Sequence, residues 1–299
     1  MIVTGRRFIS SIRIWSRGGF TLVELMIAMV VSIISMGVFF SVYTLQQRYH
    51  RDQQLVLTAQ QNLRASMLII EKQIRMAGYD PLDSGQFGIV DIRRYDLVNK
   101  TQLNLNGLPV FYYTRDENED GELEENSHHR RKINKEHLQL RVSDFHGDGH
   151  ICLTWDNGSG HRPLSENIVS IGFAYAFDLD NDGYLDCWHN GRHTIWAVDS
   201  DNDNLLDTHI DTNDDGLINE KDDRNNDFRI DSNDGGKILV QVPLEYIRAV
   251  RVWLLAKTAQ PVKIIQGRGP FVVGNCIVPS IKNGCAAIVA ENFVMCRNL

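Results

Sequence analysis

The chain has 299 residues, of which 43% are hydrophobic and 23% are charged. This composition is that of a globular protein, and it excludes a disordered, fibrous or polytopic membrane chain. The 31 Lys and Arg against 38 Asp and Glu give a net charge of −7, which argues against binding of nucleic acid through overall charge.

The N-terminal segment has the charge pattern of a membrane anchor. Residues 1–19 contain four arginines and no acid, and Phe20–Tyr43 is apolar except for Glu24. A helix of about 20 apolar residues crosses the hydrocarbon core of a bilayer. The arginines predict that the N-terminal end stays in the cytoplasm and that the remainder is exported.

Three interpretations of this segment compete. A secretory signal peptide would have a shorter apolar run and a small-residue cleavage site, which residues 36–40 do not supply. A plain anchor leaves the carboxylate of Glu24 unexplained, because an acid within a membrane is costly and normally has a partner. Finally, the segment Gly18–Met29 resembles the class III signal of type IV prepilins and type II secretion pseudopilins.

That resemblance implies that prepilin peptidase cuts between Gly19 and Phe20, and that the new amine of Phe20 is methylated. Glu24 is then the fifth mature residue, where the family keeps a glutamate. A lone carboxylate in hydrocarbon must be neutralised or find a cation. When subunits stack into a filament, the terminal amine of a neighbouring Phe20 can supply that cation.

A long helix is predicted to follow. Apolar residues recur at steps of three and four, which places them on one helix face: Ala59, Leu63, Met67, Ile70, Ile74 and Ala77. No Pro or Gly interrupts Val38–Ala77, and Gly78 and Pro81 then provide a helix stop. We expect residues 20–45 to lie in the membrane or filament core and residues 46–78 to form an amphipathic helix. A two-stranded coiled coil is the alternative, but no heptads are sustained.

Residues 79–299 are predicted to form a β-rich head. In Val169–Phe177 large and small residues alternate, which indicates a central strand covered on both faces. The other expected strands are Phe87–Ile92, Leu108–Thr114, Leu138–Val142, Thr194–Val198, Ile247–Ala256 and Ala287–Met295. One long helix before many strands is an α+β plan, as in the pilin fold. The segments Ile74–Pro81, Tyr246–Ala256 and Arg297-Asn298 resemble PilW-type minor pilins.

Residues 178–235 contain seventeen Asp or Glu against four Lys or Arg, a net charge of −13. Four repeats begin at Asp178, Asp199, Asp211 and Asp223, each with Asp or Asn at positions 1, 3 and 5 and Leu or Ile at position 8. Oxygens at positions 1, 3, 5, 7, 9 and 12 wrap a loop around one hard cation. The predicted ligands are Asp178, Asp180, Asp182, Tyr184, Asp186, Asp199, Asp201, Asp203, Asp207, Asp211, Asn213, Asp215, Leu217, Asn219, Asp222, Asp223, Asn225, Asp227 and Asp231.

These repeats resemble dockerin and thrombospondin type 3 loops, which implies two or more calcium ions. Calcium suits six to eight flexible oxygen ligands better than magnesium does. Two of the loops lack the turn glycine and have Asn204 and Phe228 instead, and only Asp222 and Asp234 offer a carboxylate at position 12. An acidic disordered insertion is the alternative. Weaker loops of the same kind begin at Asp116 and Asp144.

The cysteines are Cys152, Cys187, Cys276, Cys285 and Cys296, and export would place them in an oxidising compartment. The sequence does not assign their pairing. A Cys276–Cys285 bridge would close a short C-terminal loop, like the D-region of pilins, and Cys152–Cys187 is the second expected bridge. No CxxC, phosphate-binding loop, nucleophile elbow or HExxH motif occurs, so we expect no enzyme. His128-His129 is expected in a solvated loop.

The sequence is therefore identified as a minor pilin of a type IV pilus, similar to the PilW type. It would be a single-pass protein of the inner membrane with a periplasmic head, and would later reach the pilus and the cell surface. The implied partners are other minor and major pilins and the inner-membrane assembly machinery. The alternatives are a type II secretion pseudopilin, a DNA-uptake pilin, which the −13 segment disfavours, and a membrane-tethered enzyme.

Overall fold

The structure is a computed structural model that describes residues 19–95, 108–123, 137–143, 145, 152–156, 161–188, 192–262, 269–281 and 284–299. The chain divides into two units, which end at His50 and at Leu299. Helix α1 (Leu22–Arg75) has 54 residues, so the predicted helix of more than fifty residues is confirmed.

In the unit Arg51–Leu299, the second half of α1 packs against the head along the predicted stripe. All six residues of that stripe are buried, and Leu63, Met67, Ile70 and Ile74 belong to the main hydrophobic core. The helix ends where Gly78 adopts a φ of 71°, and its N–H donates to the Thr114 carbonyl at 2.9 Å. This bond ties the end of the helix to the first sheet.

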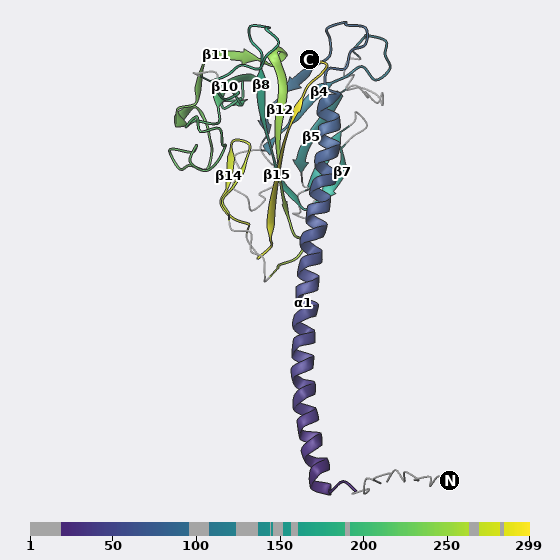
Figure 1. Cartoon of the computed structure of the whole chain (residues 1–299). Helices are drawn as coiled ribbons and strands as arrows, with labels where there is room; N and C mark the ends of the chain where they lie inside the picture. Colours follow the sequence, from purple (N-terminus) through teal and green to yellow (C-terminus); the bar gives the residue numbers. More distant parts are fainter. Residues whose placement is uncertain are drawn as a thin grey trace, which may run out of the picture. The chain divides into compact units, whose positions relative to one another are not determined.

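The head contains two antiparallel sheets (Figure 1). The five-stranded sheet has the order β1-β4-β5-β6-β7, with the bounds β1 Ile89–Asp91, β4 Phe111–Thr114, β5 His137–Ser143, β6 Cys152–Asp156 and β7 His161–Glu166. The six-stranded sheet has the order β11-β10-β9-β8-β12-β15, with the bounds β11 Lys237–Pro243, β10 Leu205–His209, β9 Ala197–Val198, β8 Ile168–Phe177, β12 Ile247–Lys257 and β15 Ala287–Met295. Two smaller pairs join β2 Arg94–Tyr95 to β3 Leu108–Pro109 and β13 Phe271–Val273 to β14 Cys276–Val278. Short 3-10 turns lie at Ser232–Asp234 and Leu244–Tyr246.

Large and small residues alternate in β8 because its two faces pack against different parts of the head. All ten residues of β8 are buried, so the expectation of a doubly covered central strand is confirmed. Phe173 and Tyr175 lie in the main core, together with residues of α1 and the five-stranded sheet. On the other face, a Cβ at Gly172 would lie 2.4 Å from the backbone of Val273. The hairpin β13–β14 therefore packs directly on β8 and requires small residues there.

A second core lies on that outer face. Trp253 and Leu255 of β12 pack there with Val273, Val278, Ile210 and Ile230. The last two residues belong to the acidic segment, which therefore contributes buried side chains to the head. An acidic disordered insertion is wrong for this segment, because a disordered segment would bury no such residues.

Every strand expected from the sequence is present in the part of the chain that the structure describes, but seven further strands there were not expected. Strand β7 is polar and contains Pro163, and it lies at a sheet edge, where proline is tolerated. Strand β10 lies inside the acidic segment and has β9 and β11 as its neighbours. These strands depend on pairing between distant segments more than on local hydrophobic pattern.

Candidate functional site

The N-terminal segment begins with an exposed turn. Gly19 and Phe20 precede α1, and the Phe20 side chain is 90% exposed. Thr21 and Glu24 form a reciprocal cap, in which the Thr21 N–H donates to Glu24 Oε2 at 2.9 Å and the Glu24 N–H donates to Thr21 Oγ1 at 3.3 Å. This is a capping box, which satisfies two backbone donors at the start of the helix. The sequence prediction gave Glu24 a role between subunits and missed this role within the chain.

By length and composition, α1 is apolar enough to cross a membrane. An 18-residue window near its N-terminus has a mean hydropathy of 2.5, and none of that window is buried. The exposed side chains there are those of the apolar run predicted to lie in the membrane or filament core. The arginines of residues 1–18, and the cleavage motif up to Gly18, lie outside the described residues.

The four predicted acidic loops share one backbone conformation. We name each loop after its first residue: the Asp178, Asp199, Asp211 and Asp223 loops. In every loop the first aspartate is buried, and it accepts a hydrogen bond from the N–H of position 6 at 2.8 to 2.9 Å. The carboxylate at position 5 accepts from the N–H of position 7, also at 2.8 to 2.9 Å. Repeated aspartates thus fold each loop back on itself.

Positions 4 and 6 of these loops adopt a left-handed backbone. At position 6, φ is 86° for Gly183 and 83° for Gly216, and it is 69° for both Asn204 and Phe228. The two loops without glycine therefore keep the same turn, although a side chain there is strained. Asn tolerates this region better than most residues, whereas Phe228 is an outlier.

Two of the loops bring three carboxylates together. One carboxylate oxygen from each of Asp178, Asp180 and Asp182 lies within 4.8 Å of the others. The same holds for Asp199, Asp201 and Asp203. These two Asp-rich clusters could hold metal ions. In the other two loops position 3 is an asparagine, Asn213 or Asn225, so the oxygens there include a neutral amide.

The loops close in two ways. In the Asp178 and Asp199 loops the closing carboxylate is at position 9, where Asp186 and Asp207 each accept from a backbone N–H of position 2 at 3.0 Å. In the Asp211 loop Asp222, at position 12, accepts from the Asn219 N–H at 2.8 Å. In the Asp223 loop the residue at position 12 is Asp234, which accepts from the Arg224 N–H at 2.8 Å.

Asp234 is only 1% exposed and was not in the predicted ligand set. The Asp234 carboxylate also accepts from the Asp231 N–H at 2.9 Å, so it links the backbone of Asp231 to that of the Asp223 loop. The signal in the sequence that identifies Asp234 as a candidate ligand is its place at position 12 of the loop that begins at Asp223. Tyr184 and Leu217, at position 7 of their loops, were predicted to bind through their backbone carbonyls. The Leu217 carbonyl accepts a hydrogen bond from the Asn219 side chain at 3.2 Å. The Tyr184 side chain is exposed.

A fifth loop has the same geometry. Asp116 is 1% exposed and accepts from the Gly121 N–H at 2.9 Å, and Asp120 accepts from the Glu122 N–H at 2.9 Å. Glu119 and Gly121 adopt φ values of 61° and 75° at positions 4 and 6. The weaker loop predicted at Asp144 and the histidines at 128–129 lie outside the described residues.

The apolar residue at position 8 anchors the loops to the head. Leu206 and Ile230 are completely buried, one in each hydrophobic core, and Ile218 packs against the second core. Leu185 is half-buried. A cation that orders these loops would therefore also order the outer face of the six-stranded sheet.

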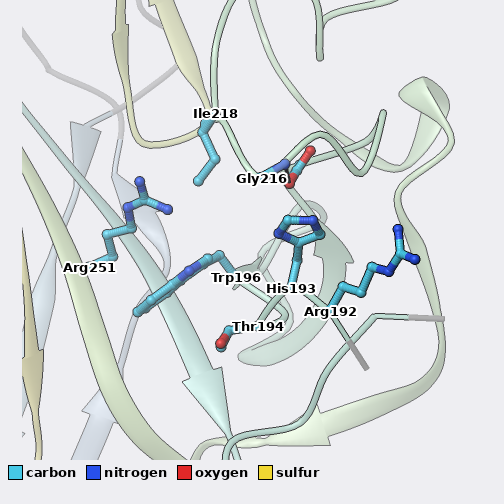
Figure 2. A pocket seen from close by; sticks show the side chains of 8 residues that line it. Arg192, His193, Thr194, Trp196, Gly216, Ile218 and Arg251 are labelled. Carbon is cyan, nitrogen blue, oxygen red and sulfur yellow. Dashed lines mark hydrogen bonds between the residues drawn. The ribbon is translucent and has the colours of Figure 1, made fainter. Parts of the chain in front are cut away.

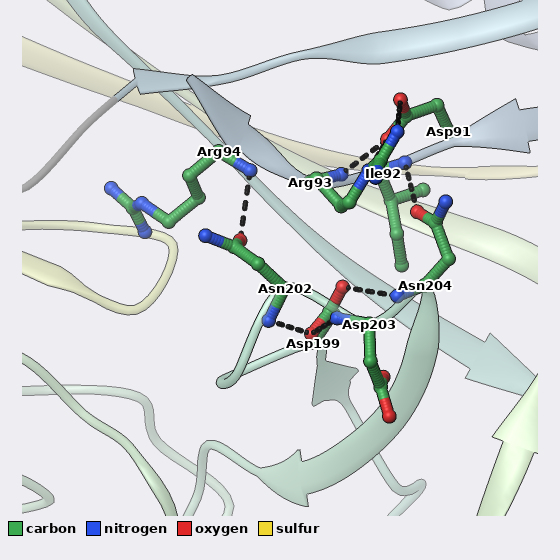
Figure 3. Close-up of polar contacts among 8 residues, drawn as sticks. All are labelled: Asp91, Ile92, Arg93, Arg94, Asp199, Asn202, Asp203 and Asn204. Atoms are coloured by element: carbon green, nitrogen blue, oxygen red, sulfur yellow. Dashed lines mark hydrogen bonds and ion pairs between the residues drawn. The ribbon is translucent and has the colours of Figure 1, made fainter. Parts of the chain in front are cut away.

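The Asp199 loop is bonded to a distant part of the head, as Figure 3 shows. The Asn204 side-chain oxygen accepts from the Ile92 N–H at 3.2 Å, and that of Asn202 accepts from the Arg94 N–H at 3.0 Å. The Asp223 loop is joined through its backbone to the β13–β14 hairpin, since the Ile277 N–H donates to the Phe228 carbonyl at 2.9 Å. Both of the loops that lack the turn glycine therefore bond to a distant part of the head.

Burial raises the pKa of Asp199, although N–H groups of its own loop oppose the effect. Burial likewise raises the pKa of Asp222. Both shifts mean that removal from water disfavours the charged form of these carboxylates. A bound cation would favour that charged form and offset the cost.

The predicted disulfides are not present in the structure, in which all five cysteines have free thiols. Cys276 is buried in β14, and its sulfur accepts from the Arg94 guanidinium at 2.8 Å, so it is engaged away from Cys285. The Cys152 thiol donates to the Ser143 carbonyl and the Cys187 thiol to the Leu185 carbonyl, both at 3.5 Å. The bridges Cys276–Cys285 and Cys152–Cys187 stay predictions, which the reactivity of the thiols can test.

Comparisons with known proteins identify the N-terminal segment. Residues 16–40 match the family model described as the prokaryotic N-terminal methylation motif. No curated protein matches the chain in sequence. A type IV-like pilin from Thermus thermophilus is similar in structure, with 12% sequence identity, coverage of 80% of this chain and 97% of that chain, and a TM-score of 0.36.

An apolar helix that carries this motif fits a subunit that is anchored in the membrane and ends up in a pilus. Such a subunit interacts with other pilins and with the assembly machinery, which indicates a structural protein. Over residues 16–40 the chain therefore has a prokaryotic N-terminal methylation motif, and the apolar helix and antiparallel β-rich head that follow have the plan of a pilin-like α+β fold.

Proposed function

We propose that the protein is a minor pilin of a type IV pilus, similar to the PilW type, that primes or caps the filament. The observation that carries the proposal is the methylation motif at residues 16–40, at the start of an exposed apolar helix. Prepilin peptidase would cut between Gly19 and Phe20 and methylate Phe20. Both residues are exposed, as a protease site must be.

Glu24 supports the assembly role through its position. It lies in the first turn of α1, beside the residues that become the new N-terminus. Its cap leaves the carboxylate exposed, with Oε2 bonded to Thr21 and room for a second partner. The methylated amine of a neighbouring Phe20 would supply that partner when subunits stack in the filament core.

Calcium would stabilise the head by binding the acidic loops. Two like charges 4 Å apart repel by about 1 kcal/mol in water, and by more when they are partly buried. The Asp178 loop and the Asp199 loop each contain three carboxylates that have one oxygen within 4.8 Å of the others. Each backbone N–H bond uses one lone pair of a carboxylate, which has about four, so these carboxylates keep lone pairs for a cation. Loops of flexible oxygen ligands favour calcium over magnesium.

Processing is tested by mass spectrometry of the mature protein from its native membrane. We expect an N-terminal peptide that begins with N-methyl-Phe20, and no such peptide from a Gly19→Val variant. Mature protein that retains residue 17 would contradict the prepilin interpretation.

A pull-down of the tagged chain from sheared pili tests whether it belongs to a type IV pilus or to a type II secretion system. We expect major and minor pilins to be recovered with it. Recovery with secretion pseudopilins and absence from pili would instead assign the chain to a type II secretion system.

A further inference from the structure

A small polar pocket lies beside the Asp211 loop in the second unit. Its volume is about 240 Å³, and its lining includes Arg192, His193, Thr194, Trp196 and Arg251 (Figure 2). Arg251 and Arg192 lie on opposite sides of the pocket, with Trp196 and His193 between them. The Asp211 loop completes the wall with Asp211 and Gly216.

Most of the polar groups that line the pocket are hydrogen-bond donors. They are two guanidinium groups, an imidazole and a hydroxyl. Asp211 is the one carboxylate among the lining residues, and it accepts from N–H groups of its own loop, Asp215 at 3.2 Å and Gly216 at 2.8 Å. The donors that line the pocket are complementary to an anion, whereas the net charge of −13 of the surrounding segment opposes an anion at longer range.

The pocket is also rigid on two sides. The Arg251 Cζ lies 5.4 Å from the ring centroid of Trp196 and 5.1 Å from that of Trp253, and the guanidinium is ion-paired with Glu291. These contacts hold the guanidinium in one orientation. The His193 ring lies so close to Gly216 that a Cβ there would be 2.8 Å from its Nδ1. A receptor held in place binds with a lower ordering cost.

We propose that this pocket binds a small carboxylate carried on a single ring. Arg192 is exposed and can make a charge-assisted hydrogen bond to the carboxylate, while Trp196 offers an apolar wall to the ring. The volume lies below the range of about 300 to 1,000 Å³ that is typical of drug-sized ligands, so one ring fills it. This binding is separate from assembly and from the binding of a cation, although the Asp211 loop forms one wall of the pocket, and so it goes beyond the proposed function.

The test uses the full-length mature protein in detergent micelles with calcium present. Ligand-observed NMR titrations with glucuronate and benzoate are compared with neutral glucose and benzyl alcohol. We expect one of the acids to bind about tenfold more tightly than its neutral counterpart. The acid that binds distinguishes a sugar acid from an aromatic acid. Failure of both acids to bind, or equal binding of the neutral compounds, would overturn the proposal.

Two matched variants separate the pocket from the general charge of the segment. Arg192→Gln removes a lining guanidinium from an exposed position, and should weaken binding of the acid about tenfold. Lys221→Gln removes the same charge from another exposed position of the acidic segment, outside the lining, and should leave affinity unchanged. An equal loss in both variants would mean long-range attraction and no site. Calorimetry that finds no calcium binding would overturn the calcium proposal alone and leave this one standing.

Discussion

Asn204 and Ile92 are 112 residues apart in the chain, yet the Asn204 side-chain oxygen accepts a hydrogen bond from the Ile92 N–H at 3.2 Å (Figure 3). Asn204 also occupies the turn position that is glycine in the Asp178 and Asp211 loops, and it adopts the same left-handed backbone, with a φ of 69°. A glycine at position 204 would adopt the same left-handed backbone but could not accept the hydrogen bond from Ile92. The asparagine therefore joins the six-stranded sheet, at the start of β10, to the five-stranded sheet, just after β1.

The double variant Asn202→Gly, Asn204→Gly tests this connection. Glycine keeps the left-handed turn, so the change removes two side-chain acceptors and leaves the N–H groups of Ile92 and Arg94 without them. We expect a loss of about 1 to 3 kcal/mol in the free energy of unfolding. Hydrogen exchange should speed up at residues 92–94.

Asn181→Gly is the control for that variant, because Asn181 is the exposed residue at position 4 of the Asp178 loop, with a φ of 56°. Its side chain accepts only a weak bond from Arg248 at 3.4 Å. Exchange at residues 92–94 should not change in this control. Unchanged exchange in the double variant as well would show that the two bonds do not hold the sheets together.

Removal of calcium should lower the melting temperature of the mature protein in detergent. A ligand that binds only the folded state stabilises it by about 2.7 kcal/mol at a concentration one hundred times its dissociation constant. For a head of this size we expect a fall of roughly 5 to 10 °C in chelator. Differential scanning calorimetry measures the shift.

Magnesium and sodium chloride are the controls for that measurement. Magnesium should substitute poorly, because it demands tight octahedral geometry. Screening alone would let sodium chloride reproduce the effect at matched ionic strength. If the melting temperature follows ionic strength and calorimetry detects no calcium binding, the metal assignment fails.

Single carboxylates can be neutralised without loss of the turn. Asp182→Asn and Asp215→Asn each keep an oxygen that can accept from the N–H of position 7, but remove one ligand charge. Each should reduce the stabilisation by calcium by about 1 kcal/mol. Asp214→Asn removes the same charge at position 4 of the Asp211 loop, which is not a ligand position, and should keep the full calcium effect. An equal reduction in all three variants would mean that calcium acts only through net charge.

Two substitutions at Glu24 separate its two roles. Glu24→Gln keeps an acceptor for the Thr21 N–H but removes the charge, whereas Glu24→Ala removes both. If the charge pairs with a neighbour's amine, both variants should be cleaved normally and both should enter pili poorly. Quantitative immunoblots of sheared pili measure incorporation. Normal incorporation of Glu24→Gln would show that only the helix cap matters.

The thiols should differ widely in reactivity in the native protein. Burial raises the pKa of the Cys296 thiol to about 12, so at pH 8 almost none of it is thiolate, the form that reacts. Cys187 is exposed. Without reductant, iodoacetamide should modify Cys187 first and Cys296 last, as peptide mapping would show. Protection of Cys187 until reductant is added would restore the predicted disulfide.

The sequence alone predicted the features that depend on local spacing. A helix face repeats every three or four residues, so the stripe from Ala59 to Ala77 was readable, and all of it is buried. The acidic loops could be predicted for the same reason, because each is built from bonds within about twelve residues. The same rule identifies Asp234, at position 12 of the Asp223 loop.

Only the tertiary structure decided the features that join distant segments. The hydrophobic pattern does not show that the Asn204 side chain bonds to Ile92, nor that the Arg94 guanidinium bonds to the sulfur of Cys276. Strands such as β7 and β10 also gain their order from partners elsewhere in the chain. Local bonds are specified by neighbouring residues, whereas long-range bonds form only after the sheets and the loops have packed together.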